Sequence, residues 1–343
     1  MPHRTFIAFL WPSALAMLLF IALPILSVGV QSLFIAHEQV IETVENCGPF
    51  GCKTVDVVNT EATARLRAEE PLGRFNGLGT YLNRNHLAVE EIGLAWDEAS
   101  GPGDFAGRVM NLPFYKALAF TLTYTFVVTP LVIILGFVIA LAVNRIPGMF
   151  KGPTIFVSLL PMIVTPLIGS LVLFWMIDSK GIIGATLQTL FEDPDLSLKA
   201  STTLTWLTLI VYGVWHSAPF AFVVFYAGLQ TVPQDTLESA MIDGASRWER
   251  VLHVVIPHLM PLAVFITLIQ LMDNFRVFEP IVGFNAQANA TSLSWIIYND
   301  LRGSDGAMLF GSAAATSLLT IIGVCILLTP VIIRSWRANR RAA

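Results

Sequence analysis

Six long stretches without a charged residue constrain what this chain can fold into. They lie between Arg4 and Glu38, Lys116 and Arg145, Lys151 and Asp178, Lys199 and Asp235, Arg250 and Asp273, and Asp305 and Arg334. A helix needs about 20 mostly apolar residues to cross the hydrocarbon core of a bilayer. Charged residues make up 13% of the chain, about half the share found in soluble domains. The sequence therefore predicts an all-α membrane protein with six transmembrane helices.

The expected spans cover residues 6–34, 117–143, 153–177, 202–229, 260–282 and 307–333. The first contains an apolar run far longer than the roughly 7–15 residues of a signal-peptide core, so we expect a retained span rather than a cleaved signal. The fifth charge-free stretch is the tightest, and its helix would have to bury Asp273, Arg276 and Glu279. Ionisable groups at that depth are costly and usually face a bundle interior or a wet cavity.

Basic residues in the short connections predict the orientation, because Lys and Arg concentrate on the cytoplasmic side. One side would hold Arg4, Arg145, Lys151, Arg247, Arg250 and the arginines of the C-terminal tail, whereas the opposite short loops hold only Lys180, Lys199 and Arg302. Both termini are then cytoplasmic. The expected parts are a first span with its N-terminus at 1–34, an extracytoplasmic insertion at 35–116, a five-helix core at 117–333 and a basic cytoplasmic tail at 334–343.

The insertion holds half of the chain's acidic residues, so the net charge of −4 is mostly a property of this segment. It is too polar for a large core, and we expect a small, partly irregular domain. Cys47 and Cys52 flank Gly-Pro-Phe-Gly there. In an oxidising compartment they are candidates for a disulfide, with two free thiols as the alternative. Cys325, in the last span, is expected to be a small packing residue.

A charged segment at 233–257 interrupts the apolar pattern between the fourth and fifth spans. Pro233 suits a first helical position, and Asp235 and Glu238 favour a helix N-terminus. Gly244 supplies the left-handed conformation that ends a helix, after which Arg247 to Val255 would resume one and Pro257 would stop it. The expected product is a bent helical pair across the membrane face, where exposed Glu238 and Arg247 are available to a cytoplasmic partner.

The residues of this segment resemble a known signature. Glu238-Ser239-Ala240, three residues, Gly244, nine residues and then Val254-x-Ile256-Pro257 are similar to the EAA motif of binding-protein-dependent ABC importer permeases. Asp243-Gly244-Ala245-Ser246-Arg247-Trp248 resembles the carbohydrate-importer version. Phe174 to Ile183, Thr291 with Tyr298, and Phe310 to Ala313 also resemble the family, so the likeness covers most of the span region. The chain departs from the pattern at Ser239, where Ala is usual, and at Val251, where Phe is favoured.

The resemblance implies a type I ABC importer permease fold in a bacterial inner membrane. It also implies a non-catalytic subunit of a complex with a second permease, a cytoplasmic ATPase dimer and a periplasmic solute-binding protein. ATP and Mg would then belong to the ATPase, which agrees with the lack of a phosphate-binding Gly-x-x-x-x-Gly-Lys-Ser/Thr loop in this chain. The residues that would couple to the ATPase are Glu238, Ser239, Ala240, Asp243, Gly244, Ala245 and Arg247.

Polar residues inside the fourth and fifth spans are the candidates for solute binding. They are Tyr212, His216 and Ser217, then Gln270, Asp273, Asn274 and Val277. Gln270, Asn274 and Val277 share a helix face by their spacing, and Asn274 matches an asparagine that faces the sugar in maltose-type permeases. Mixed aromatic and hydrogen-bonding groups suit a sugar. For Asp273 and Arg276 an internal ion pair is the alternative, for His216 an ordinary core histidine, and Glu279 and Arg276 could instead contact a docked binding protein.

Other functions remain open at this point. Within transporters, the solute could be a polyol, glycerol phosphate or a spermidine-like cation instead of an oligosaccharide or related glycoside. A membrane-embedded enzyme could use Asp273 and Glu279 as paired carboxylates, but six residues apart on a helix they would point in opposite directions. No repeated charged ring or filter-like segment favours a channel. No metal-ligand cluster is visible, and no nucleic-acid partner is expected.

Overall fold

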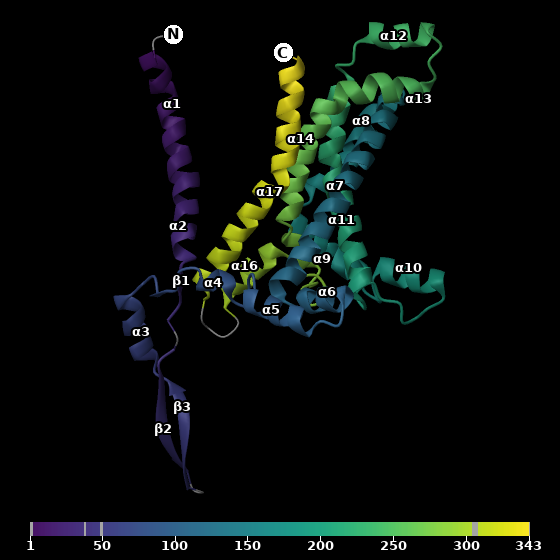
Figure 1. The fold of residues 1–343 in the computed structure, drawn as a ribbon. Coiled ribbons are helices and arrows are strands. Elements are labelled where there is room, and N and C mark those ends of the chain that lie inside the picture. The colour runs from purple at the N-terminus through teal and green to yellow at the C-terminus, as the bar shows by residue number, and fades with distance from the viewer. Residues whose placement is uncertain (1–2, 38, 49–50, 304–307, 343) are drawn as a thin grey trace. The chain divides into compact units, whose positions relative to one another are not determined.

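The structure is a computed structural model that describes residues 3–37, 39–48, 51–303 and 308–342. Among these residues, five helices are long and apolar enough to cross a membrane, or six if one sharply bent pair is a single span. The chain divides into two compact units, residues 1–115 with 296–321 and residues 116–295 with 322–343. Figure 1 gives the element labels.

The first unit contains the N-terminal span and most of the expected insertion. Its helices are α1 (His3–Met17), a π-helical turn (Leu18–Ala22), α2 (Leu23–Gln31), α3 (Thr60–Glu69), α4 (Gly79–Leu82), α5 (Val89–Glu98) and α6 (Pro102–Met110). Its strands are β1 (Phe34–Ile35), β2 (Ile41–Gly48), β3 (Gly51–Val58) and β4 (Arg74–Phe75), and they form the antiparallel pairs β1–β4 and β2–β3. In Figure 1 β2 and β3 form a long two-stranded hairpin.

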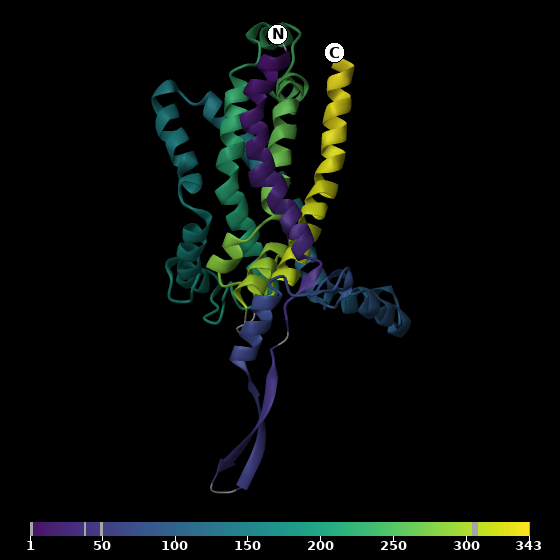
Figure 2. The same ribbon diagram turned by 90° about the vertical axis from the view of Figure 1, so that its left-hand side faces the viewer.

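The second unit contains most of the remaining helices. They are α7 (Pro113–Arg145), α8 (Gly148–Ile163), α9 (Pro166–Met176), α10 (Ile182–Phe191), α11 (Thr202–Leu229), α12 (Gln234–Ile242), α13 (Arg247–Arg250), a π-helical turn (Val251–Val255), α14 (Ile256–Phe275) and α15 (Glu279–Gly283). The divisions between the units fall within α7, within α16 (Leu293–Arg302) and within α17 (Phe310–Ala342). In both views α12 lies across the end of α11 (Figures 1 and 2).

The core of the second unit follows from a four-residue repeat on α7. Phe120, Tyr124, Val128 and Val132 are all nearly inaccessible to solvent, because residues four apart lie on the same helix face. They pack in one cluster with Leu209 and Phe222 of α11 and with Ile266 of α14. Farther along α7, a Cβ on Gly136 would lie 2.8 Å from the Phe222 backbone nitrogen, so α7 and α11 approach each other where only a glycine fits.

The third expected span is not one straight helix. α8 and α9 meet at an angle of 93° across Val164 and Thr165. The cause is Pro166, since the proline ring disfavours helical backbone in the preceding residue. Thr165 accordingly has φ −61° and ψ 144°. At the bend Val164 has extended backbone with φ −79° and ψ 128°, so its carbonyl lies beyond the end of α8.

The prediction that Pro257 stops a helix is wrong. The helix runs without interruption from Arg247 to Phe275. The π-helical turn Val251–Val255 precedes the proline, and the Ile256 N–H donates to the Val251 carbonyl across five residues instead of four. This wider turn is a known way to relieve a helix at a proline, which lacks an N–H and crowds the turn before it.

The expectation that Asp273, Arg276 and Glu279 are buried in the fifth span is also wrong for this chain. α14 ends at Phe275, and a short irregular segment leads to α15. The side chains of Asp273 and Arg276 are 53% and 55% exposed, and Glu279 is exposed as well. The charged groups therefore sit where the helix ends, so the full desolvation cost of an ion inside an apolar core is avoided.

The cysteines have different outcomes. Cys47 and Cys52 are register partners in the β2–β3 hairpin, an arrangement whose backbone spacing suits a disulfide. Their side chains lie outside the described residues, so the disulfide stays a prediction. Cys325 is a free thiol on α17 and is exposed in this chain, so its role as a packing residue stays a prediction.

A buried histidine organises the polar part of the first unit. His86 is 0% exposed. Its Nδ1 lies 2.9 Å from Asn83 Oδ1, and its Nε2 lies 3.1 Å from both the Ser312 carbonyl oxygen and Thr316 Oγ1. The Ser312 hydroxyl donates to Asp300 Oδ2 at 2.7 Å. Burial lowers the pKa of His86, and burial also raises the pKa of the Asp300 carboxyl.

We predict that His86 makes the stability of this unit depend on pH. Because its pKa is lowered from 6.5, the unfolded chain binds the proton more readily than the folded chain. The stabilisation is therefore fully present above about pH 6.5 and is lost as the pH falls below that value. Asp300 has the opposite sign, since its raised pKa favours the neutral carboxyl on folding.

The measurement is the thermal unfolding midpoint of the purified protein at about pH 7.5 and about pH 5.5. The midpoint should fall between these values in the wild type and fall less in His86→Gln. His253→Gln removes an exposed histidine and should keep the wild-type dependence. An equal fall in His86→Gln would refute the assignment.

Candidate functional site

A cavity of 450 Å³ opens in the second unit beside the bend between α8 and α9. Its walls come from α7, α11, the end of α14 and the start of α15. They are formed by Tyr124, Pro166, Tyr212, Gly213, His216, Ser217, Asp273, Asn274, Arg276, Val277, Glu279 and Pro280. Six of the seven solute-binding candidates from the sequence lie in this wall. The seventh, Gln270, does not line it.

Two side chains of α11 both line the cavity and hold the bend. The Tyr212 hydroxyl donates to the Pro166 carbonyl oxygen at 2.7 Å, and His216 Nε2 lies 3.1 Å from the Val164 carbonyl oxygen. A carbonyl can only accept, so Nε2 carries the proton in this contact. Tyr212 and His216 are four residues apart, which places them one above the other on the helix. His216 is therefore a structural donor to the broken helix, as well as part of the wall.

The end of α14 supplies the charges. Arg276 Nη2 donates to Asp273 Oδ1 at 2.8 Å, and its Nε donates to the Met272 carbonyl at 3.3 Å. This is the local ion pair that the sequence left open. Glu279 follows in the first turn of α15. Two carboxylates and one guanidinium give the wall a formal charge of −1.

Asn274 and Gln270 are engaged inside the bundle. They are 5% and 4% exposed. The Asn274 amide donates to Thr129 Oγ1 at 3.0 Å and to Gln270 Oε1 at 3.4 Å. Asn274 thus reaches the cavity from behind with its donors already used, and Gln270 positions it.

Tyr124 is a wall residue that sequence reasoning missed. It lies on α7, and the hydroxyl-bearing residues Thr121, Thr125 and Thr129 at four-residue spacing beside it were the available signal. Gly213 was missed too. A Cβ on Gly213 would collide with the Tyr124 hydroxyl oxygen, so the glycine gives the phenol its place at the cavity.

The α12–α13 segment forms a second candidate surface. α12 has no buried residue, and its neighbourhood exposes Ile242 (86%) and Trp248 (81%). Such apolar exposure marks an interaction site more often than a solvated loop. Among the coupling candidates Glu238, Ser239, Asp243, Gly244 and Arg247 are exposed, whereas Ala240 and Ala245 are half-buried.

Gly244 makes the turn between these helices. The Ala245 N–H donates to the Ala240 carbonyl at 2.9 Å, and the Gly244 N–H donates to the Met241 carbonyl at 3.1 Å. This is the Schellman pattern, and Gly244 has the required positive φ of 82°. After the turn Ser246 and Glu249 form a reciprocal capping box that starts α13.

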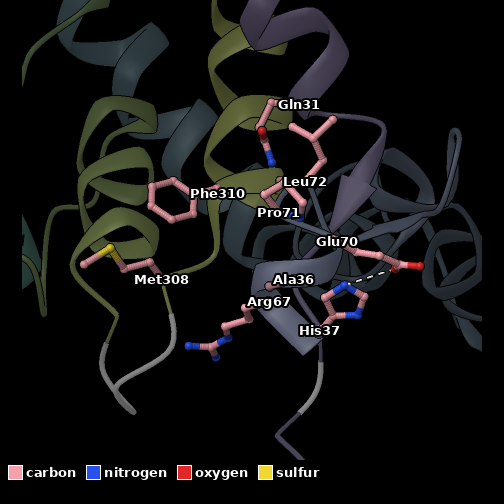
Figure 3. Close-up of a pocket in the computed structure, with 11 residues that line it drawn as sticks. Gln31, Ala36, His37, Arg67, Glu70, Pro71, Leu72, Met308 and Phe310 are labelled. Atoms are coloured by element: carbon pink, nitrogen blue, oxygen red, sulfur yellow. Dashed lines mark ion pairs between the residues drawn. The ribbon is translucent and has the colours of Figure 1, made fainter. Parts of the chain in front are cut away.

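A smaller cavity of 240 Å³ lies in the first unit (Figure 3). His37 Nε2 lies 3.3 Å from Glu70 Oε2, and Arg67 extends away from that pair. Met308 and Phe310 form part of its wall. No solute-binding candidate from the sequence lies in this cavity.

Comparison with known proteins identifies the class of the chain. Residues 103–336 match the family model described as binding-protein-dependent transport system inner membrane component. The trehalose/maltose transport system permease protein MalF of Thermococcus litoralis is 29% identical over 61% of this chain and 70% of its own length. The trehalose transport system permease protein SugA of Mycobacterium tuberculosis is 30% identical over 64% and 69%, respectively.

The fold also matches a solved structure. A chain of a bacterial ABC transporter involved in the import of the acidic polysaccharide alginate aligns with a TM-score of 0.59 and 21% identity, over 81% of this chain and 96% of that one. The chain therefore belongs to the inner membrane components of binding-protein-dependent transport systems. It has the ABC importer permease fold and is a multi-pass membrane subunit distinct from the ATPase, which handles ATP.

We predict that Tyr212→Phe weakens the bend beside the cavity. The change removes one buried hydrogen bond to the Pro166 carbonyl and should cost about 1 kcal/mol. Thermal stability and uptake by the assembled transporter should both fall. Tyr226→Phe, on the same helix but outside the cavity wall, is the control. Wild-type stability and uptake in Tyr212→Phe would show that the hydroxyl is dispensable.

Proposed function

We propose that this importer subunit carries a sugar, either an oligosaccharide or a related glycoside, through the 450 Å³ cavity of the second unit. The observation that supports the proposal is the wall chemistry. Phenol groups of Tyr124 and Tyr212 adjoin the carboxylates of Asp273 and Glu279. One related protein is named for trehalose/maltose transport and another for trehalose transport, and both names favour a sugar as the solute.

Each group in the wall suits a polyhydroxylated solute. Sugar hydroxyls both donate and accept, so they can donate to carboxylates while accepting from a phenol or a guanidinium. Aromatic rings offer apolar faces to the C–H surfaces of a pyranose. Asp273 and Arg276 are about half exposed, so their polar atoms remain accessible to a solute although they also contact each other.

The second surface would receive the ATPase. We infer that α12, with Glu238 exposed and Gly244 making the turn, docks on a cytoplasmic ATPase dimer.

A second permease subunit would complete the pathway, and both termini of this chain would lie in the cytoplasm of a bacterial cell. ATPase closure would then rock the spans between inward-facing and outward-facing states around the cavity. A periplasmic binding protein would deliver the solute.

An importer of glycerol phosphate or a polyol is the alternative. A phosphate group needs a cation that is free to bind it, and Arg276 is the cavity's only arginine among the described residues. Its guanidinium already donates to Asp273. A sugar therefore fits the wall better than a phosphorylated solute does.

The deciding experiment is a thermal-shift screen of the cognate binding protein with trehalose, maltose, a maltodextrin, glycerol and glycerol 3-phosphate, followed by uptake of the best ligand into vesicles that contain the full transporter. Stabilisation by a sugar and uptake of that sugar support the proposal. Stabilisation by glycerol 3-phosphate alone would overturn the choice of sugar.

We predict that Asp273→Asn lowers sugar uptake about tenfold. It removes a charged acceptor, and hydrogen bonds to charged groups contribute about 1.5–3 kcal/mol. Uptake should be measured against sugar concentration, with Asp97→Asn on α5 as the matched control. If the solute were glycerol phosphate, release of Arg276 would raise uptake instead.

We predict that Gly244→Val impairs coupling, whereas Gly244→Asn is tolerated. The space around Gly244 is open, because a Cβ there would have no atom within 4 Å. The cost therefore comes only from the positive φ, about 1–2 kcal/mol for an ordinary residue and less for Asn. The measurement is sugar-stimulated ATP hydrolysis by the complex, normalised to the amount of this subunit in the membrane. Equal rates in the two variants would argue against a role for this turn.

A further inference from the structure

A second large cavity lies where α7, α11 and α13 come together, at the end of the unit where α12 lies. Its volume is 460 Å³. Three arginines line it, Arg145 as the last residue of α7 and Arg247 and Arg250 on α13. Leu141, Leu229 and Val255 are among its apolar lining residues. The cavity lining thus combines three cationic groups with apolar side chains.

The three arginines form no ion pair with an acid in the described part of the chain. Among the described residues, no Asp or Glu oxygen lies within 4 Å of these three guanidinium groups. The nearest acid in sequence, Glu249, uses its carboxylate on the Ser246 backbone N–H at 2.6 Å.

Arg250 shows the shortage most directly. Its Nε is buried and has no hydrogen-bond partner. A buried donor on a charged group is costly to leave unsatisfied. A ligand that supplies an anionic oxygen in this cavity would remove that cost.

We propose that this cavity binds an anionic phospholipid. The phosphate would be held by Arg145, Arg247 and Arg250, and the first part of an acyl chain would cover the apolar lining residues. Basic pockets at the ends of transmembrane helices are a recurrent place for anionic headgroups. A free phosphate would leave the apolar lining residues uncovered, whereas a lipid offers both a phosphate for the arginines and an acyl chain for the apolar residues. The proposal rests on the family assignment and is independent of which solute is carried.

The position gives such a lipid a specific effect. α13 continues directly into the long helix that ends at the solute cavity, and it follows the Gly244 turn of α12. A phosphate that bridges Arg145 of α7 to Arg247 and Arg250 of α13 would fix this segment against the bundle. Anionic lipid should therefore support coupling as well as stability.

The test uses the complete transporter, purified from nanodiscs of phosphatidylcholine mixed with phosphatidylglycerol. Native mass spectrometry measures how much phosphatidylglycerol stays bound after mild detergent washing. The variant Arg145→Gln/Arg247→Gln/Arg250→Gln should retain at least about tenfold less than the wild type. Arg334→Gln/Arg337→Gln/Arg340→Gln removes the same charge from the C-terminal tail and should retain the wild-type amount.

A single conservative substitution provides a variant that should fold even if the triple Gln variant does not. Arg250→Lys keeps the charge but loses the guanidinium donors, so it should fold and show intermediate retention. Wild-type retention of phosphatidylglycerol in the triple Gln variant would overturn the proposal. The proposal would also be overturned if the permease subunits alone retained phosphatidylglycerol but lost it when the ATPase binds. In that case the arginines would bind a carboxylate of the ATPase. Since no solute is involved, the result is separate from the test of sugar transport.

Discussion

A helix that breaks inside a membrane exposes carbonyl groups that only the protein can satisfy, because lipid tails offer no hydrogen-bond donor. In this chain the break between α8 and α9 meets that requirement through α11. His216 donates to the Val164 carbonyl, which lies past the end of α8, and Tyr212 donates to the carbonyl of Pro166, the first residue of α9. The same two side chains then form a wall of the cavity. The site exists because one helix supplies donors to the interruption in another.

The two other interruptions follow a similar rule. α14 ends before Arg276, and the Ser292 hydroxyl donates to the Val277 carbonyl at 2.6 Å. At the other end of the same long helix, the Gly244 turn satisfies the last carbonyls of α12 with backbone N–H groups. Each interruption places candidate functional residues at a point where regular backbone stops. The uninterrupted helices between them provide the rigid frame that holds these points in register.

The sequence predicts the class of this fold well because charge exclusion is a strong and simple signal. A Lys or Arg inside a span is costly, so the gaps between charges locate the helices. The turn after α12 could also be predicted from the sequence, since it depends on one residue, Gly244. Six of the seven solute-binding candidates lie around one cavity, because Tyr212, His216 and Ser217 share a span and the others share the end of the next. Their roles in binding stay predictions.

Local reading failed where proline had two possible outcomes. Pro166 bends its span by 93°, whereas Pro257 lies within a continuous helix. A π-helical turn at Val251–Val255 precedes Pro257, and no residue in the sequence announces it. Whether the Asp273 and Arg276 side chains are buried or exposed also depended on where the helix ends. Tyr124 was missed for another reason, since it lies in a charge-free span where the threonines beside it were the only signal, and its place at the cavity depends on close packing against Gly213 of another helix.

The π-helical turn also has a consequence for the geometry of the whole rod from Arg247 to Phe275. An α-helix turns by about 100° for each residue, and a π-turn adds one residue to one turn. Without that extra residue, side chains beyond it would face a direction about 100° away. Val251–Val255 therefore sets the rotational phase between the two ends of the rod. Asp273 and Asn274 line the solute cavity, while Arg247 and Arg250 line the arginine cavity beside α7, because the five residues that follow Arg250 are wound more widely than the rest.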